Sequence, residues 1–187
     1  MYNNITGGSK DKIHLVKIIG STIIVSYDFK ILDNDEVQWR EIHLYKTTPA
    51  FEQVKKAIID DINSRTDEKI LTGFVWNEKP VYLSSENQFN FKAAYDLAVQ
   101  TQGQSLPVTF KLGEKDGEPI YYEFTNMVEF TDFYVQAISF INNCLKKGWR
   151  EKDSIDFEPY KEFFEEKNEE PQTEPEEQSQ EESQEEN

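Results

Sequence analysis

The side chains best suited to metal binding or nucleophilic catalysis are two histidines, His14 and His43, and one cysteine, Cys144. A metal centre built on histidine and cysteine needs several ligands. Two histidines on expected strands, with no patterned carboxylate beside them, are more simply ordinary strand residues. Cys144 falls on the apolar stripe of an expected helix, where cysteine behaves as a small hydrophobic residue. We therefore expect a buried Cys144 and neither a metal nor another cofactor.

Two short segments share only part of a known binding motif. Residues 7–10, Gly-Gly-Ser-Lys, lack the leading glycine of a phosphate-binding loop and follow no strand, so we expect a flexible arm. Residues 33–36, Asp-Asn-Asp-Glu, lack the central glycine and distant glutamate of a calcium loop, which favours a hairpin turn. Carboxylates are too abundant for their spacing to select an acid–base pair. The sequence therefore predicts a protein that is not an enzyme, with a small hydrolase as a remote alternative.

Aromatic and aliphatic residues offer a binding hypothesis instead. Val37 and Trp39 lie on one face of an expected strand, and Ile42 and Leu44 lie on the other. A strand that is apolar on both faces needs a second surface to cover it, from its own domain or from a partner. Trp76 lies at the mouth of an expected hairpin, and an exposed tryptophan often anchors a partner. These five residues are the candidate partner interface, with burial in the core as the alternative.

Strand patterns dominate the first 48 residues. Residues 23–31 alternate between strongly apolar and more polar side chains, which is typical of a strand with one buried face. A second strand is expected at 12–19 and a third at 37–45, so that the segment forms a three-stranded antiparallel meander. The strands at 12–19 and 37–45 would be its edges, whose unpaired N–H and C=O groups can accept a strand from another chain.

Helices and hairpins alternate in the rest of the chain. The expected elements are helices over residues 49–64, 85–103 and 126–148, hairpins over 70–83 and 108–124, and a short amphipathic segment over 159–166 that packs back on the fold. Hairpins, rather than alternating βαβ units, predict an α+β fold with antiparallel sheets and three to four helices.

Acidic residues outnumber basic ones, 36 to 20, which gives a net charge of −16. Residues 168–187 hold nine glutamates and no basic, aliphatic or aromatic side chain, so this segment is expected to be a disordered acidic tail. We interpret this tail as a segment that keeps the protein soluble. The alternative is a segment that binds a basic partner. The overall charge argues against binding to nucleic acid or to an anionic membrane, because both need basic patches.

These patterns divide the chain into four expected parts. They are an N-terminal meander at 1–48, an α+β domain at 49–153, a short amphipathic helix at 154–167 and the acidic tail at 168–187. No uncharged apolar run approaches the roughly 20 residues of a membrane helix. A single cysteine excludes an internal disulfide framework, and the first residues lack the order of a secretory signal, so we expect a reducing, aqueous compartment.

Three stretches carry a resemblance to a known family. They are residues 70–76 (ILTGFVW), 81–91 (VYLSSENQFNF) and 144–153 (CLKKGWREKD). Over residues 49–153 the sequence resembles a domain of unknown function found in tailed-phage proteins, and it is similar to proteins of Bacteroides-infecting gut phages, including the crAss-like phages. Members of that group often occur among tail, fibre and other virion components. The resemblance implies no catalytic residue in this sequence.

The resemblance implies a structural function. The expectation is a non-enzymatic virion protein, in a fibre, a tail or a module attached to the capsid, that contacts other virion subunits or further copies of itself. Such a protein would be assembled in the host cytoplasm and reside in the virion. The alternative is a soluble acidic regulator that binds a basic host protein.

Overall fold

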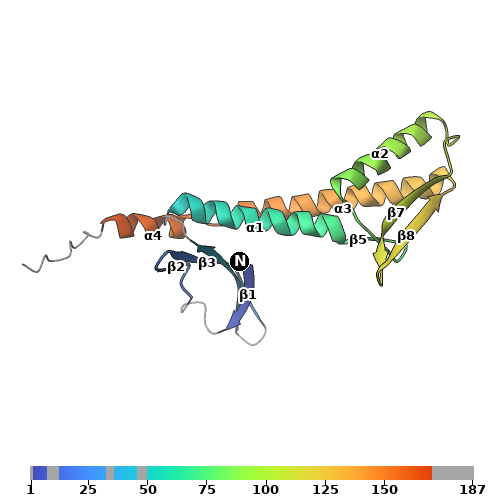
Figure 1. Cartoon of the computed structure of the whole chain (residues 1–187). Helices are drawn as coiled ribbons and strands as arrows, with labels where there is room; N and C mark the ends of the chain where they lie inside the picture. Colours follow the sequence, from blue (N-terminus) through green and yellow to red (C-terminus); the bar gives the residue numbers. More distant parts are fainter. Residues whose placement is uncertain (1, 8–12, 33–35, 46–49, 170–187) are drawn as a thin grey trace, which may run out of the picture.

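Two long helices, α1 (Phe51–Thr72) and α3 (Met127–Asp153), run side by side along the molecule (Figure 1). The computed structural model describes residues 2–7, 13–32, 36–45 and 50–169. The two helices are antiparallel: Lys152 near the end of α3 donates a hydrogen bond to Asn63 of α1, while Phe140 packs against Gly73 just after α1. Each end of the pair carries its own hydrophobic core.

A four-stranded antiparallel sheet packs under the first half of α1 (Figure 1). Its strands are β1 (Tyr2–Gly7), β2 (Val16–Ile19), β3 (Thr22–Ile31) and β4 (Val37–Tyr45), in the order β1-β4-β3-β2. The three-stranded meander is thus corrected to four strands, because residues 2–7 pair with β4. The strand at 37–45 is an inner strand and not an edge, whereas β2 is an edge as predicted. Of the arm predicted at 7–10, Gly7 ends β1 and the rest lies outside the described residues.

The core of this sheet is shared by three elements. Ile23, Val25 and Ile42 of the sheet are buried against the apolar stripe of α1. The third element, α4 (Glu158–Glu169), adds Tyr160 and Phe164, which are 4% and 7% exposed. The Tyr160 hydroxyl donates to the Ser26 carbonyl at 2.8 Å and so ties α4 to β3. The prediction that residues 159–166 pack back on the fold is therefore confirmed.

The opposite end of the helix pair holds the second core. It is built from β5 (Phe74–Trp76), β6 (Lys79–Val81), α2 (Ser85–Gln100), β7 (Val108–Lys115) and β8 (Glu118–Phe124), together with α3. Val108 pairs with Phe124 and Phe110 with Tyr122, which confirms the hairpin predicted over 108–124. Gly113 is needed where β7 passes β6, because a Cβ there would lie 2.5 Å from the carbonyl oxygen of Pro80. The α+β class is confirmed.

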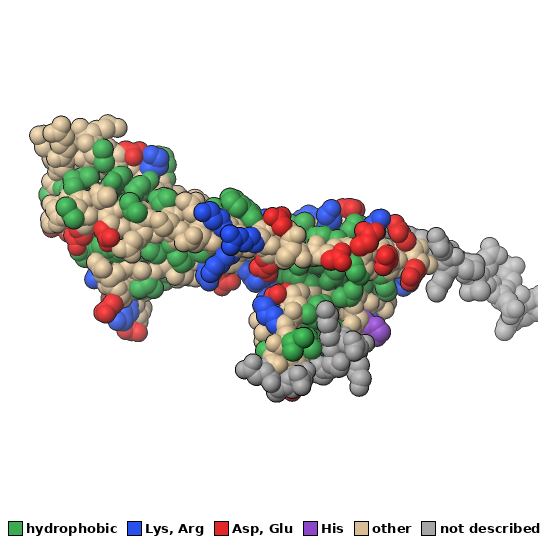
Figure 2. Space-filling view, turned by 180° about the vertical axis from the view of Figure 1, so that it is seen from behind, with side chains coloured by type: hydrophobic (Ala, Val, Ile, Leu, Met, Phe, Trp, Pro, Cys, Tyr) green, Lys and Arg blue, Asp and Glu red, His purple; other side chains and the backbone are tan. Residues whose placement is uncertain are grey.

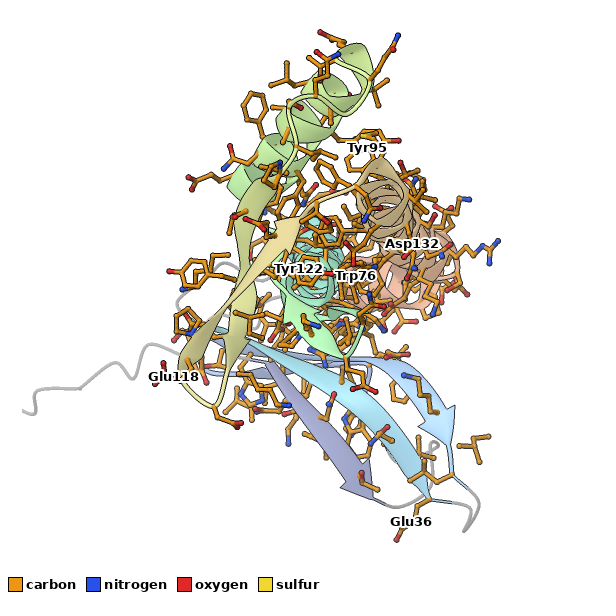
Figure 3. All side chains as sticks on the ribbon, turned by 90° about the vertical axis from the view of Figure 1, so that its right-hand side faces the viewer. Glu36, Trp76, Tyr95, Glu118, Tyr122 and Asp132 are labelled. Carbon is orange, nitrogen blue, oxygen red and sulfur yellow. The ribbon has the colours of Figure 1, made fainter. Side chains whose placement is uncertain are left out.

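Aromatic rings fill this second core. Trp76 lies edge-on to Tyr122 and Phe133, with ring centroids 5.1 and 5.2 Å apart, and its indole N–H donates to Asp132 at 3.0 Å (Figure 3). Edge-to-face pairs of this kind add stabilisation beyond the area that they bury. Trp76 is therefore at the centre of the aromatic packing that holds the first half of α3 against the two hairpins.

Two helix ends differ from the sequence-based expectation. The first helix was expected to end near Ser64 and a strand to begin at Ile70, but α1 continues to Thr72 with Ile70 buried on its core face. The long helix was expected to stop at Gly148, but α3 continues to Asp153. Gly148 instead lies where α3 approaches α1 closely, since a Cβ there would lie 2.5 Å from Thr66 Oγ1.

Candidate functional site

Three residues of the predicted partner interface are buried inside the protein. Val37 is 3% exposed, and Ile42 and Trp76 are each 1% exposed. Ile42 packs between the sheet and α1, and Trp76 is the centre of the second core. The second surface that the apolar strand needs is supplied by the chain itself. The interface prediction is therefore wrong for these three residues.

The other two interface residues are half-buried. Leu44 packs at the margin of the sheet core. The ring of Trp39 lies against β1, since a Cβ on Gly7 would be 3.6 Å from it. The Trp39 indole N–H is buried and finds no hydrogen-bond partner among the described residues. A partner contact at Trp39 and Leu44 stays a prediction.

The residues considered for metal or thiol chemistry are dispersed over the structure. His43 lies on β4 and contacts Glu41, while His14 is exposed and precedes β2. Cys144 is 5% exposed in the second core, so its predicted burial is confirmed. Within the described part of the chain, no group of three or more histidine, cysteine, aspartate or glutamate residues could hold a metal ion.

A buried cluster of charges, which sequence reasoning missed, joins the sheet to both long helices. Asp61 of α1 is 2% exposed and accepts two hydrogen bonds from the Arg40 guanidinium, at 2.7 and 2.8 Å. It also accepts the Tyr27 hydroxyl of β3. Arg65 donates to Asp61 at 3.2 Å and pairs with Glu151 of α3. Four elements are thereby connected through one carboxylate. We call these five residues the Asp61 cluster.

The pKa values in the Asp61 cluster follow from burial and hydrogen bonding. Burial alone would raise the pKa of Asp61, but the hydrogen bonds from Arg40 and Tyr27 outweigh it and hold the pKa below its ordinary value. Burial, and then the hydrogen bond to Asp61, raise the pKa of Tyr27. Tyr27 is thus a protonated donor at neutral pH. The cluster holds two cations and two carboxylates, so its charges balance. Its hydrogen bonds and ion pairs connect elements of the fold, and we call it a structural joint.

One signal in the sequence could have located this cluster. Asp61 follows Ile58 by three residues and precedes Ile62 by one, so it lies on the apolar stripe of α1. A charged residue on such a stripe must be paired where it is buried. Its partners could not be identified in the same way, because Tyr27 and Arg40 are distant in sequence and meet Asp61 only in the folded chain.

A hollow of about 440 Å³ lies beside the Asp61 cluster. It is lined on one side by Tyr27, Asp28 and Phe29 of β3 and on the other by Ile155 and Tyr160 around the start of α4. Both tyrosine hydroxyls already donate within the protein, to Asp61 and to the Ser26 carbonyl. The hollow therefore lies between β3 and the start of α4. Both tyrosine hydroxyls that line it are already used in hydrogen bonds within the protein.

The outer edge of β1 is the least protected strand edge of the sheet. The Leu32 N–H donates to the Glu36 carbonyl at 2.8 Å, so even-numbered positions along β4 turn their main-chain groups toward β3. Odd-numbered positions turn theirs toward β1, where Asn3 pairs with Glu41. The N–H and C=O of Asn4 and Thr6 consequently point outward, and no described element pairs with that edge.

The two sheet edges differ in chemistry. Natural edge strands are protected by shortness, charge or proline. The edge strand β2 has four residues and carries Lys17, with its side chain exposed. The other edge, β1, has six residues, YNNITG, with no charge and no proline. Strand addition is therefore favoured at β1.

Comparisons with family models, curated proteins and solved structures find no match to the chain. Among the helices that the structure describes, none has the length and apolar character to span a membrane.

Proposed function

We propose that this protein is a non-enzymatic structural subunit of a phage virion that acts through protein–protein contacts. The observation that carries the proposal is the open edge of β1. An extended segment of a neighbouring subunit would pair there and extend the sheet, which is a recurrent mode of protein recognition. Affinity would come from main-chain hydrogen bonds to Asn4 and Thr6.

The structural joint around Asp61 supports the same function. A subunit added at β1 would become part of the sheet. The sheet is connected to α1 by the bonds from Arg40 to Asp61, and α1 is connected to α3 by the ion pair of Arg65 with Glu151. A subunit that is docked at β1 would therefore be coupled to a second core at the far end of the helix pair. The resemblance of residues 49–153 to a tailed-phage domain is the reason for proposing a virion in particular.

A proline pair at β1 tests the proposal. The Thr6 N–H points outward, so Thr6→Pro removes a donor from the free edge while leaving the protein's own ladder intact. Asn3 faces β4, so Asn3→Pro removes a bond of the protein's own sheet. The readout is incorporation into purified particles, by mass spectrometry, beside circular dichroism of each isolated variant.

The expected result is a folded Thr6→Pro protein that is depleted from particles. Asn3→Pro should lose stability and serves as the positional control. If the wild-type chain is absent from purified particles, the virion proposal is wrong. If folded Thr6→Pro is incorporated normally, the β1 edge is not the assembly contact.

The acidic segment favours a second candidate function, a soluble regulator that binds a basic host protein. Nine glutamates without a basic residue between 168 and 187 give charge complementarity to such a partner. This candidate predicts early synthesis during infection and absence from particles. Binding that weakens steeply with salt and is lost on removal of residues 170–187 would support it.

A further inference from the structure

One face of α3 is apolar and exposed, although the helix is already packed on two other sides. Val128 is 83% exposed, Val135 54% and Trp149 53%. Ile138, between them, is 40% exposed. Figure 2 shows the molecule from behind, where apolar side chains adjoin a group of basic ones midway along the length. Isolated surface hydrophobics need no explanation, but a row of them along one helix marks an interaction surface.

The spacing of this row is that of a coiled-coil seam. Positions 128, 135, 142 and 149 are seven residues apart, and 131, 138 and 145 fall between them at the second seam position. We call these residues the α3 seam: Val128, Thr131, Val135, Ile138, Asn142, Leu145 and Trp149. It spans three heptads, about 32 Å at 1.5 Å per residue. That length suits pairing with another long helix.

The structure leaves the seam accessible between two flanks. On one flank, Tyr95 of α2 stacks on Tyr134 and contacts Thr131. On the other flank lies Asp132, which Figure 3 shows on a different side of α3 from Tyr95. The helix α1 packs on a third side, where Gly148 meets Thr66. Thr131 and Leu145 are half-buried, because Thr131 contacts Tyr95 and Leu145 packs on the second core. Another helix would therefore rest mainly on the exposed Val128, Val135, Ile138 and Trp149.

The distribution of charge along α3 identifies the occupant. The first turns of α3 carry Glu129 and Asp132, whereas its last third carries Lys146, Lys147 and Arg150; of the two acidic residues there, Glu151 already pairs with Arg65. None of these three basic side chains forms an ion pair with a described residue. The helix is thus acidic at one end and basic at the other, and the surface complementary to it is the same helix reversed.

We propose that two copies of this chain associate through α3 in an antiparallel coiled-coil pair. In this pair a residue at the first seam position of one helix lies opposite a residue at the second seam position of the other. Val135 then lies against Leu145 of the second copy, and Ile138 against Asn142 of the second copy. In the same register Asp132 lies beside Lys146 of the second copy, and the two-fold axis repeats every contact. The axis passes near Ser139.

The antiparallel direction follows from charge. A parallel pair would place Lys146 beside Ile141 of the second copy and Asp132 beside Met127 of the second copy, so it would form no ion pair along the seam. The antiparallel pair instead aligns opposite charges at both ends. Asn142 opposite Ile138 places one polar residue near the centre, a device that fixes register at a cost in stability.

Oligomeric state tests the proposal first. Sedimentation velocity of the full chain should give a species of twice the 22.0 kDa chain mass, in a concentration-dependent equilibrium. Ile138→Glu should produce a folded monomer, because it puts a charge into the middle of the seam. Asn143→Glu introduces the same charge at an exposed position off the seam and should leave the dimer intact. A monomeric wild-type chain at tens of micromolar, or a dimer insensitive to Ile138→Glu, would overturn the proposal.

Adjacent lysines give a charge-matched comparison. Lys146 flanks the seam and Lys147 points away from it, so Lys146→Glu and Lys147→Glu alter net charge equally. Lys146→Glu reverses one charge in both symmetry-related contacts with Asp132. It should therefore raise the dissociation constant of the dimer about tenfold, and more at low salt. Equal effects of the two substitutions would refute the proposed flank contact.

Cross-linking tests the direction. In a Cys144→Ala background, Ser139→Cys lies at the two-fold axis of the antiparallel pair and should form a disulfide-linked dimer under mild oxidation. Val128→Cys would lie at opposite ends of that pair and should stay unlinked, whereas it would be linked in a parallel pair. Linkage through Val128→Cys would overturn the antiparallel arrangement. These outcomes are independent of the β1 edge, because Thr6→Pro leaves α3 unchanged.

Discussion

Replacing Asp61 by asparagine removes the charge that the whole Asp61 cluster depends on. The substitution keeps the side-chain shape but leaves the Arg40 guanidinium without its counter-ion. The Asp61 side chain is 3% exposed and that of Arg40 is 15% exposed, so water cannot compensate the arginine fully. Arg65 is less affected, since Glu151 remains as a partner.

The size of the loss can be bounded from this geometry. Removing one member of a buried ion pair costs about 3–5 kcal/mol. Because Arg65 keeps Glu151 and asparagine retains one acceptor, we expect the lower end, about 3 kcal/mol. The adjacent Asp60 pairs with Lys56 at the surface, with both side chains at least 47% exposed. Asp60→Asn should therefore cost below about 0.5 kcal/mol.

Urea unfolding followed by circular dichroism measures both variants. With a slope of about 2 kcal/mol per molar urea, Asp61→Asn should lower the midpoint by about 1.5 M, and Asp60→Asn by less than about 0.3 M. Similar midpoints for the two variants would refute the idea that Asp61 is a joint between sheet and helices. A binding or catalytic role for the cluster would not by itself predict this difference.

The same cluster predicts how stability changes with pH. Because the pKa of Asp61 is lowered in the folded state, its contribution is present above pH about 4 and is lost as the pH falls through the folded value. The stability difference between wild type and Asp61→Asn should therefore shrink below pH 4. The pKa of Tyr27 is raised, so its contribution is lost as the pH rises above about 10. Tyr27→Phe should reduce that alkaline loss.

Three further predictions concern packing. Gly148→Ala should destabilise by about 1–3 kcal/mol in urea unfolding through the clash with Thr66, and Thr66→Ala should restore most of that loss in the double variant. Removing residues 170–187 should leave the melting temperature nearly unchanged, whereas removing 158–187 should lower it by several degrees, because α4 packs in the sheet core. Cys144→Ala should cost about 1 kcal/mol, and the wild-type thiol should label far more slowly than free cysteine; rapid labelling would contradict its burial.

Local patterns were sufficient for elements whose partners are close in sequence. The hairpin of β7 and β8 was predicted at its observed position, because alternation and a glycine turn define it within 17 residues, Val108–Phe124, although a register shift after Lys111 pairs Ile120 with Gly113. The start of α3 was also expected near residue 126, where Asn126 accepts a hydrogen bond from the Glu129 N–H at 3.0 Å. The expected start of α2 at residue 85 is likewise confirmed, with Ser84 as its cap.

The first strand could not be predicted in this way. The strand β1 has one aliphatic side chain, Ile5, so periodicity gives no signal. It forms because β4 lies beside it, and tertiary pairing decides strand formation where intrinsic preference is weak. The same omission made the strand at 37–45 an expected edge, whereas residues 2–7 pair with it.

Glycine and tryptophan were misjudged for a related reason. Gly148 resembled a helix stop, but the close approach of α1 at Thr66 gives a glycine another purpose inside α3. Trp76 resembled an exposed anchor, yet its indole N–H is satisfied by Asp132 from a helix 56 positions away. Only the packing of distant elements distinguishes these alternatives.

The three faces of α3 separate folding from association. Phe133 and Ala137 hold the helix in the second core, and Gly148 brings it against α1. Val135 and Ile138 lie on a different face, with 54% and 40% of their surfaces exposed, so burial within the chain does not account for them. Substitutions on the packed face should therefore change the free energy of unfolding at every protein concentration. Substitutions in the α3 seam should change stability only where the dimer is populated, because association stabilises by mass action. A seam variant whose unfolding midpoint differs from wild type equally at high and low concentration would place these residues in the fold and not at an interface.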